Sequence, residues 1–170
     1  MPELTEIRWH ARAGQGAKTA SQLLAEAMLR AGKSVQAFPE YGPERRGAPM
    51  RAYTRIDDKP IRRHDSVTSP DVVVVLDPSL VHEGDVTNGM TEGGLVLVNA
   101  QTVPAELSGA TVRCVPAGTN VNVAMAGAVA AALGEPASTD VADAAVELLG
   151  GKVDEASLRA AAEEGFRAAV

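Results

Sequence analysis

A glycine-rich turn joins a strand-like segment to a helical segment near the start of this sequence, and it is suited to binding an anion. The turn runs from Ala13 to Thr19 and has Gly14, Gln15 and Gly16 at its centre. Small residues let a ligand approach the backbone closely, and the free N–H groups of a first helical turn attract negative charge. The pattern therefore predicts an anion site of the phosphate-binding type.

The turn matches neither of two well-known nucleotide motifs. A Walker A loop has glycines where this chain has Ala17 and Arg12. A dinucleotide-binding fingerprint has its third glycine where this chain has Thr19. The pattern thus indicates an anion and leaves the identity of the ligand open.

Two adjacent arginines form a second candidate for anion recognition. Arg45 and Arg46 lie in a segment rich in glycine and proline, which restricts the backbone. Paired guanidinium groups in a structured loop suit bidentate hydrogen bonds to phosphate or carboxylate; the alternative is that both arginines only solvate the loop. Bulky side chains surround the pair, and we expect them to face a partner protein. They are Phe38, Tyr41, Met50 and Tyr53.

The remaining reactive residues give little support to catalysis by this chain alone. The three histidines have no second ligand at metal spacing, and Ser79 lacks a nucleophile-elbow motif. The single cysteine, Cys114, excludes a cysteine-ligated iron–sulfur cluster within the chain and is expected to be a buried strand residue. Asp77 follows a run of valines, where an aspartate either binds a ribose hydroxyl or ends the strand and caps the next turn.

The composition is that of one globular domain spanning residues 1–170. Hydrophobic residues make up 45% of the chain, and no apolar run is long enough to span a bilayer. The first residues lack a secretory signal pattern, so we expect a cytoplasmic protein without membrane contact.

Charge is divided unevenly along the chain. Residues 1–63 carry 12 Lys and Arg against 7 Asp and Glu, whereas residues 64–170 carry 4 against 15. A basic half joined to an acidic half favours a localised anion site over a nucleic-acid surface. The alternative is that scattered surface charges happen to segregate.

Hydrophobic periodicity predicts the elements that must position these residues. Strands are expected at residues 7–12, 34–38, 71–77, 94–99 and 111–116, and residues 50–56 and 59–62 are expected to pair as a β-hairpin around Asp57 and Asp58. Helices are expected from Ala20 to about Gly32, from Asn120 to Leu133, from Ser138 to Leu149, and from Asp154 or Ser157 to near the C-terminus.

This order of elements predicts an α/β protein with a three-layer, Rossmann-like, mostly parallel sheet and an inserted antiparallel hairpin. Ligands of such sheets gather at the carboxyl ends of the strands. That rule places the Gly14 turn together with residues 77–79, residues 99–101 and Asn120 along one rim.

Four stretches of the sequence together resemble the gamma subunit of 2-oxoacid:ferredoxin oxidoreductases, the family of pyruvate synthase. The stretches are Ile7 to Ala17, Ala37 to Pro49, Thr54 to Asp57 and Asp77 to Leu80, and the resemblance runs over nearly the whole chain. The family commonly has glycine at the positions of Ala11 and Ala13, which makes this turn somewhat stiffer.

The resemblance implies a subunit of an enzyme that oxidatively decarboxylates a 2-oxoacid, passes electrons to ferredoxin and forms an acyl-coenzyme A. Alpha, beta and delta-type partner subunits would carry thiamine diphosphate, magnesium and the iron–sulfur clusters, and this chain alone would bind no cofactor and perform no catalysis. In related single-chain enzymes the matching domain covers the active site and helps to hold coenzyme A. We therefore predict a shared coenzyme A site, with contacts from Gly14, Gln15, Gly16, Arg45, Arg46 and Asn120.

Two other functions remain open on the sequence. One is an architectural subunit that only buries partner surface, and the other is a free-standing Rossmann-type nucleotide-binding enzyme. The incomplete glycine fingerprint argues against the second.

Overall fold

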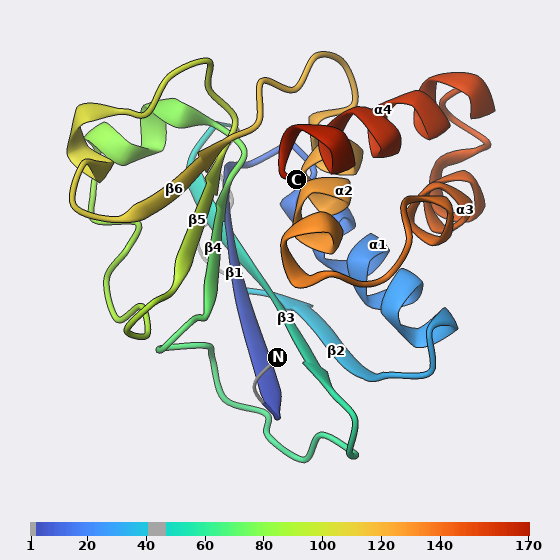
Figure 1. The fold of residues 1–170 in the computed structure, drawn as a ribbon, viewed down its shortest axis with the longest axis horizontal. Coiled ribbons are helices and arrows are strands. Elements are labelled where there is room, and N and C mark those ends of the chain that lie inside the picture. Colours follow the sequence, from blue (N-terminus) through green and yellow to red (C-terminus); the bar gives the residue numbers. More distant parts are fainter. Residues whose placement is uncertain (1–2, 41–46) are drawn as a thin grey trace.

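The computed structural model describes residues 3–40 and 47–170, and it consists of one sheet with helices packed against it (Figure 1). The strands are β1 (Leu4–Arg12), β2 (Ser34–Pro39), β3 (Pro49–Asp57), β4 (Val72–Val75), β5 (Leu95–Val98) and β6 (Thr111–Cys114). The helices are α1 (Ala17–Arg30), α2 (Val121–Leu133), α3 (Ser138–Leu149) and α4 (Glu155–Ala168), and the short 3-10 helices are η1 (Pro78–His82) and η2 (Ala105–Leu107).

The sheet is mostly parallel, as the sequence predicts. Its strand order is β2-β3-β1-β4-β5-β6. Strands β1, β4, β5 and β6 pair in parallel, whereas β3 pairs antiparallel with both β1 and β2. Among the strands that the structure describes, β3 is therefore the one that runs in the opposite direction.

The expected hairpin between residues 50–56 and residues 59–62 is wrong. Strand β3 pairs with β2, where Ser34 lies opposite Asp57, and residues 59–62 form no strand. Ala52 and Ile56 of β3 are fully buried in the core between the sheet and the helices, and β1 and β2 pair with the two edges of this strand. Residues 59–62 include Pro60, which has no N–H to donate to a strand ladder.

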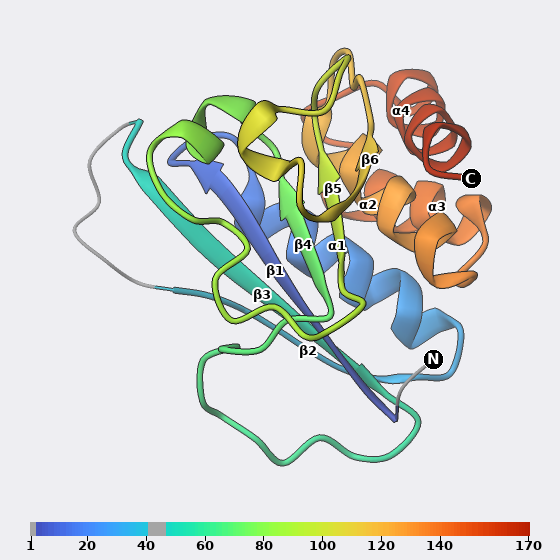
Figure 2. The same ribbon diagram turned by 60° about the vertical axis from the view of Figure 1, so that its left-hand side comes forward.

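All four α-helices lie on one face of the sheet (Figures 1 and 2). The opposite face of β4 to β6 is covered by η1, η2 and loops, which form a smaller second core. Cys114 lies in a strand, as expected, but it is the last residue of the edge strand β6 and is half-buried against this second core rather than fully buried. The third layer is thin because the connections that follow β4 and β5 each contain only a short 3-10 helix.

The larger core lies between the sheet and the helices. Trp9 is fully buried there, and its indole Nε1 donates to Thr54 Oγ1 at 3.0 Å. The small residues of α2 allow close packing on α4, as its alanine-rich sequence predicts. Helix α3 begins at Ser138 and ends at Leu149, as expected, and Ala137 is its N-cap residue. Asp154 caps α4 by accepting from Ser157 N at 2.9 Å.

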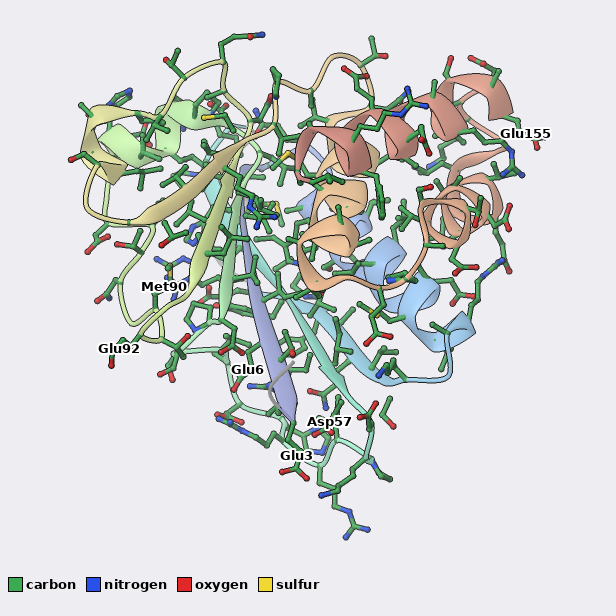
Figure 3. All side chains as sticks on the ribbon, in the orientation of Figure 1. Glu3, Glu6, Asp57, Met90, Glu92 and Glu155 are labelled. Carbon is green, nitrogen blue, oxygen red and sulfur yellow. The ribbon has the colours of Figure 1, made fainter. Side chains whose placement is uncertain are left out.

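Polar side chains cover the other face of β1 to β3. Arg8 is 4% exposed and donates to the carbonyl oxygens of Val86 and Asn88, so it fastens the loop before β5 to the sheet. At the end of the sheet where β1 begins, Glu3, Glu6 and Asp57 lie near one another (Figure 3). Charged groups rather than apolar ones thus attach the loops on this face.

One of the four bulky side chains expected to face a partner protein, Tyr53, does not do so. Tyr53 is 1% exposed, packs against Phe38 with ring centroids 5.2 Å apart, and donates to Glu40 Oε2 at 2.5 Å. It is therefore buried within this chain. Tyr41 lies outside the described residues.

Candidate functional site

A cavity of about 570 Å³ opens at the carboxyl ends of β1, β4 and β5. Its lining includes four of the predicted coenzyme A contacts and six other residues. The lining residues are Gly14, Gln15, Gly16, Leu76, Asp77, Pro78, Asn99, Asn120, Val121 and Asn122. The rim predicted from strand order is therefore where these residues meet.

Helix α1 begins at this cavity with its first turn uncapped. Gly16 is the N-cap residue, with φ of 87°, and no side chain among the described residues caps the helix. A side chain at position 16 would collide with Asn122, whose Nδ2 lies 2.8 Å from the Cβ position. Glycine is thus required at Gly16 both by its left-handed backbone and by the close approach of α2.

Helix α2 begins at the same cavity. Asn120 occupies its N-cap position in the left-handed conformation, with φ of 55°, and its carbonyl oxygen accepts from Val123 N and Ala124 N. The Asn120 side chain makes no capping bond among the described residues. Neither α1 nor α2 has an acidic residue in its first turn. The positive ends of two helix dipoles therefore converge on one cavity, an arrangement that favours an anionic ligand.

The glycine-rich turn is held in place by side chains at the ends of β1 and β4. Gln15 accepts from Arg12 N at 2.6 Å and donates from Nε2 to Asp77 Oδ2 at 2.7 Å. Arg12 Nε lies 3.4 Å from the same carboxylate oxygen, and Arg12 NH2 donates to Ser79 Oγ at 2.8 Å. Sequence reasoning missed Arg12, although its place as the last residue of β1 was a usable signal.

Asp77 caps the turn that follows β4, and the structure decides between the two functions considered for it. Its Oδ1 accepts from Ser79 N at 3.0 Å and from Ser79 Oγ at 2.6 Å. Burial opposes ionisation of Asp77, but the hydrogen bonds from Ser79 and Gln15 and the charge of Arg12 outweigh it and lower its pKa. Both oxygens are engaged within the chain, which does not fit a free ribose-binding carboxylate.

Asn99 joins two further parts of the rim. Its Nδ2 donates to Leu76 O at 3.0 Å, and its Oδ1 accepts from Ala117 N at 3.0 Å. This amide thereby fixes the end of β4 to the segment that leads into α2. Asn122 was not singled out from the sequence, where only its position two residues after Asn120 hinted at a place on the same rim.

Arg45 and Arg46 lie outside the described residues, so the structure does not test their predicted role. The two residues that follow are placed beside the cavity. Gly47 O accepts from Arg12 NH1 at 3.2 Å, and Ala48 O accepts from Ala13 N at 2.8 Å.

Residues 3–40 and 47–170 contain no group of three or more His, Cys, Asp and Glu side chains that could hold a metal ion. Within the same ranges, no helix combines the length and the apolar character needed to cross a membrane. Ser79, the candidate nucleophile considered above, hydrogen-bonds to Asp77 and Arg12 and has no histidine partner in this part of the chain.

Comparison with known proteins identifies the family. The family model for pyruvate ferredoxin/flavodoxin oxidoreductase matches residues 6–168. The chain belongs to this family. The resemblance to gamma subunits seen in the sequence is thereby confirmed, as is the α/β fold class.

Two solved structures are similar to this chain over nearly its whole length. The crystal structure of pyruvate oxidoreductase subunit PORC from Thermotoga maritima has 36% identity and a TM-score of 0.76, and the match covers 98% of this chain and 96% of that one. A 2-oxoglutarate:ferredoxin oxidoreductase from Magnetococcus marinus, with 2-oxoglutarate, coenzyme A and succinyl-CoA bound, has a TM-score of 0.81 at 16% identity. It shares the fold over 99% of this chain and 31% of its own.

Among curated relatives, the gamma subunit common to pyruvate and ketoisovalerate oxidoreductases of Thermococcus litoralis is 59% identical over 104 residues. That alignment covers 61% of this chain and 56% of the relative. In such matches the chain thus spans little more than half the length of the relative.

Proposed function

We propose that this chain is the gamma subunit of a thiamine-dependent 2-oxoacid:ferredoxin oxidoreductase complex, and that it helps to bind coenzyme A. The complex would oxidatively decarboxylate a 2-oxoacid such as pyruvate and form the acyl-coenzyme A in the cytoplasm. Family membership over residues 6–168 supports the assignment to such a complex. The similarity to pyruvate oxidoreductase subunit PORC along nearly the full length of both chains supports the choice of subunit.

The observation that carries the coenzyme A proposal is the convergence on one cavity of two helix N-termini, whose N-cap residues Gly16 and Asn120 make no side-chain capping bond. Coenzyme A bears a pyrophosphate and a 3′-phosphate, which require backbone N–H donors and fixed cations. The backbone of Gly14, Gly16 and Asn120 would lie beside these phosphates, and Arg45 and Arg46 would add positive charge. The Magnetococcus marinus enzyme, which shares the fold, is bound to coenzyme A, and this agrees with the proposal.

The proposal divides the work among subunits. Alpha, beta and delta-type partners would hold thiamine diphosphate, magnesium and the iron–sulfur clusters, with ferredoxin as the electron acceptor. Thiamine diphosphate supplies the chemistry of decarboxylation. This chain would hold the acyl acceptor and help to exclude water from the reacting groups.

The proposal is tested in the assembled complex with Arg45 and Arg46 both replaced by alanine. We expect a higher KM for coenzyme A, because each lost charged hydrogen bond costs about 1–3 kcal/mol. Decarboxylation of the 2-oxoacid without coenzyme A should persist, since it precedes acyl transfer. Arg159→Ala is the matched control, because Arg159 is an exposed arginine of α4 that pairs with Asp143 and Glu155.

An unchanged KM for coenzyme A in a normally assembled double variant would remove the two arginines from the site. If substitutions of the cavity residues also left KM unchanged, the chain would act as an architectural subunit without ligand contacts.

A further inference from the structure

The side chain of Gln15 is occupied within the chain. Its Oε1 accepts from Arg12 N at 2.6 Å, and its Nε2 donates to Asp77 Oδ2 at 2.7 Å. One acceptor position of Oε1 and one N–H of Nε2 are thereby used within the chain, and both bonds hold the amide in a fixed orientation. Gln15 lines the cavity, yet its polar groups act on the protein itself.

Asp77 and Arg12 connect every segment that meets at this side of the cavity. Asp77 binds the turn before α1 through Gln15 and the turn after β4 through Ser79. Arg12 reaches Ser79, Glu83 and the carbonyl oxygen of Gly47. The conformation of the glycine-rich turn therefore depends on an ion pair between the ends of β1 and β4.

The ion pair also affects the electrostatics of the cavity. Asp77 is one of the lining residues, and a free carboxylate there would repel an anion. Arg12 lies against it, and the two side chains are 23% and 20% exposed, so solvent screens their interaction only in part. The arginine thus offsets a negative charge beside the two helix N-termini.

We propose that Arg12 and Asp77 are positioning residues for the acyl acceptor. Asp77 holds Gln15, and through it holds the Gly14 to Gly16 turn so that the N-terminus of α1 points at the ligand. Arg12 orients Asp77 and neutralises its charge. This inference rests on the proposed binding of coenzyme A at the cavity.

A double-mutant cycle between Asp77→Asn and Gln15→Ala tests the proposal in the assembled complex. Asparagine has a single acceptor oxygen, so either Gln15 or Ser79 loses its partner. We expect each single variant to raise the KM for coenzyme A about tenfold, with kcat at saturating coenzyme A nearly unchanged. The double variant should show the same KM as either single variant, because both changes release the same turn. If the increases in KM of the two single variants multiply in the double variant, Gln15 touches the ligand directly, and this would overturn the proposal.

The control for this cycle is Asp85→Asn. Asp85 makes the same turn as Asp77, accepting from Thr87 N at 2.9 Å and from Thr87 Oγ1 at 2.6 Å, but it is not among the residues that line the cavity. We expect its KM for coenzyme A to remain that of the wild type. A rise equal to that of Asp77→Asn would indicate a general loss of loop structure and would overturn the specific role.

The charge of Arg12 is tested by Arg12→Gln, alone and together with Asp77→Asn. The single change leaves an uncompensated carboxylate in the cavity, so its KM should exceed that of Asp77→Asn. Adding Asp77→Asn should then lower the KM of Arg12→Gln by about threefold. A purely structural role predicts the reverse, a double variant with a KM at least as high as that of Arg12→Gln, and that result would overturn the proposal.

Hydrogen exchange separates this inference from the proposed function. In the complex without coenzyme A, Asp77→Asn should accelerate exchange of the amides of residues 14–17, and Asp85→Asn should not. Unchanged exchange would overturn the positioning role. A different result would instead reject coenzyme A binding at the cavity. This result is faster exchange in Asp77→Asn, together with an unchanged KM for coenzyme A both in this variant and in the variant with Arg45 and Arg46 replaced by alanine.

Discussion

The imidazole of His10 lies on the face of β1 that turns away from the helices, and the fold keeps it neutral. It is 6% exposed, and its Nε2 accepts from Arg8 Nε at 3.0 Å. Burial is the main cause that lowers its pKa to about 3, and the charges of Arg8 and Arg51 add to the effect. A protonated His10 could not accept the bond from Arg8.

This pKa predicts a loss of stability in mild acid. The unfolded chain protonates this histidine near pH 6.5, whereas the folded chain does so only near pH 3. The unfolding free energy should therefore be unaffected above pH 6.5 and fall as pH decreases towards 3, with a slope that approaches about 1.4 kcal/mol per pH unit. Denaturant unfolding at a series of pH values measures this slope.

Replacing His10 by glutamine should remove that contribution, because glutamine can accept from Arg8 and does not titrate. Equal slopes for the wild type and the His10 variant would contradict the assignment.

At the scale of elements, the contact between α2 and α4 depends on two glycines. A Cβ atom at Gly165 would lie 1.7 Å from Ala124 O, and one at Gly127 would lie 2.3 Å from Ala162 O. Real Cβ atoms do not approach backbone so closely, so the helices would have to separate. This contact fixes α2, whose first turn borders the candidate site.

We therefore expect Gly165→Ala to destabilise the protein by about 3 kcal/mol or more through overpacking, although alanine favours helix in isolation. Chemical denaturation of the purified variant measures the change. Gly109→Ala serves as the control, since nothing lies within 4 Å of its Cβ position, and it should stay within about 0.5 kcal/mol of the wild type. A Gly165 variant as stable as this control would mean that the helices can move apart at little cost.

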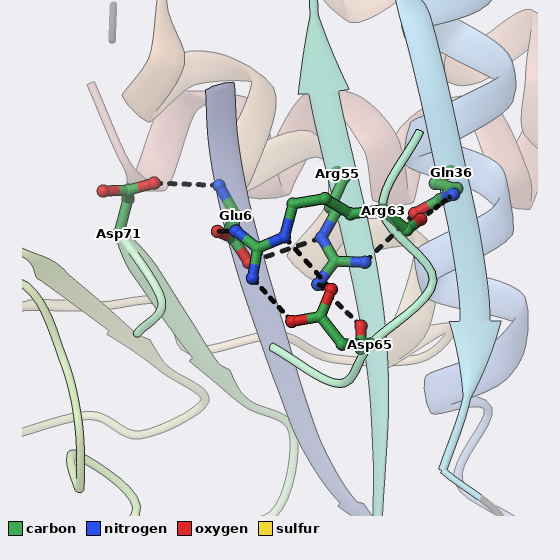
Figure 4. Close-up of polar contacts among 6 residues, drawn as sticks. All are labelled: Glu6, Gln36, Arg55, Arg63, Asp65 and Asp71. Carbon is green, nitrogen blue, oxygen red and sulfur yellow. Dashed lines mark hydrogen bonds and ion pairs between the residues drawn. The ribbon is translucent and has the colours of Figure 1, made fainter. Parts of the chain in front are cut away.

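At the scale of the whole molecule, a polar network joins the long connection after β3 to the sheet (Figure 4). Arg55 is fully buried, donates to Asp65 O at 2.6 Å and lies 3.4 Å from Glu6 Oε2. Arg63 pairs with the same two acidic residues from the solvent side, with its side chain 48% exposed. The connection has little apolar surface to bury, so charged groups attach it.

Two arginines with the same partners but different burial allow a matched test. Arg55→Met should destabilise the protein by about 3–5 kcal/mol, because the change leaves buried acceptors without their cation. Arg63→Met should cost about 1 kcal/mol or less, since the pair is screened by solvent. Equal effects on the denaturation midpoint would show that burial of Arg55 adds nothing to the network.

The sequence alone determined most of the elements and the rim. Continuous valine runs predicted the parallel strands, and Asn120 and the Gly14 turn marked the starts of two helices, because local periodicity and turn chemistry act over a few residues. The family resemblance was likewise visible in short stretches of sequence such as Asp77 to Leu80.

Only the tertiary structure decided which strand pairs with β3, because pairing depends on which segments the fold brings beside its edges and not on the turn at Asp57 alone. The tertiary structure also decided which hydrogen bonds individual side chains make. The sequence predicts Gln15 as a ligand contact but gives no sign of its hydrogen-bond partner Asp77, which lies 62 positions away along the chain. Such contacts between distant segments carry no local signal, since they arise only when the ends of β1 and β4 are brought side by side.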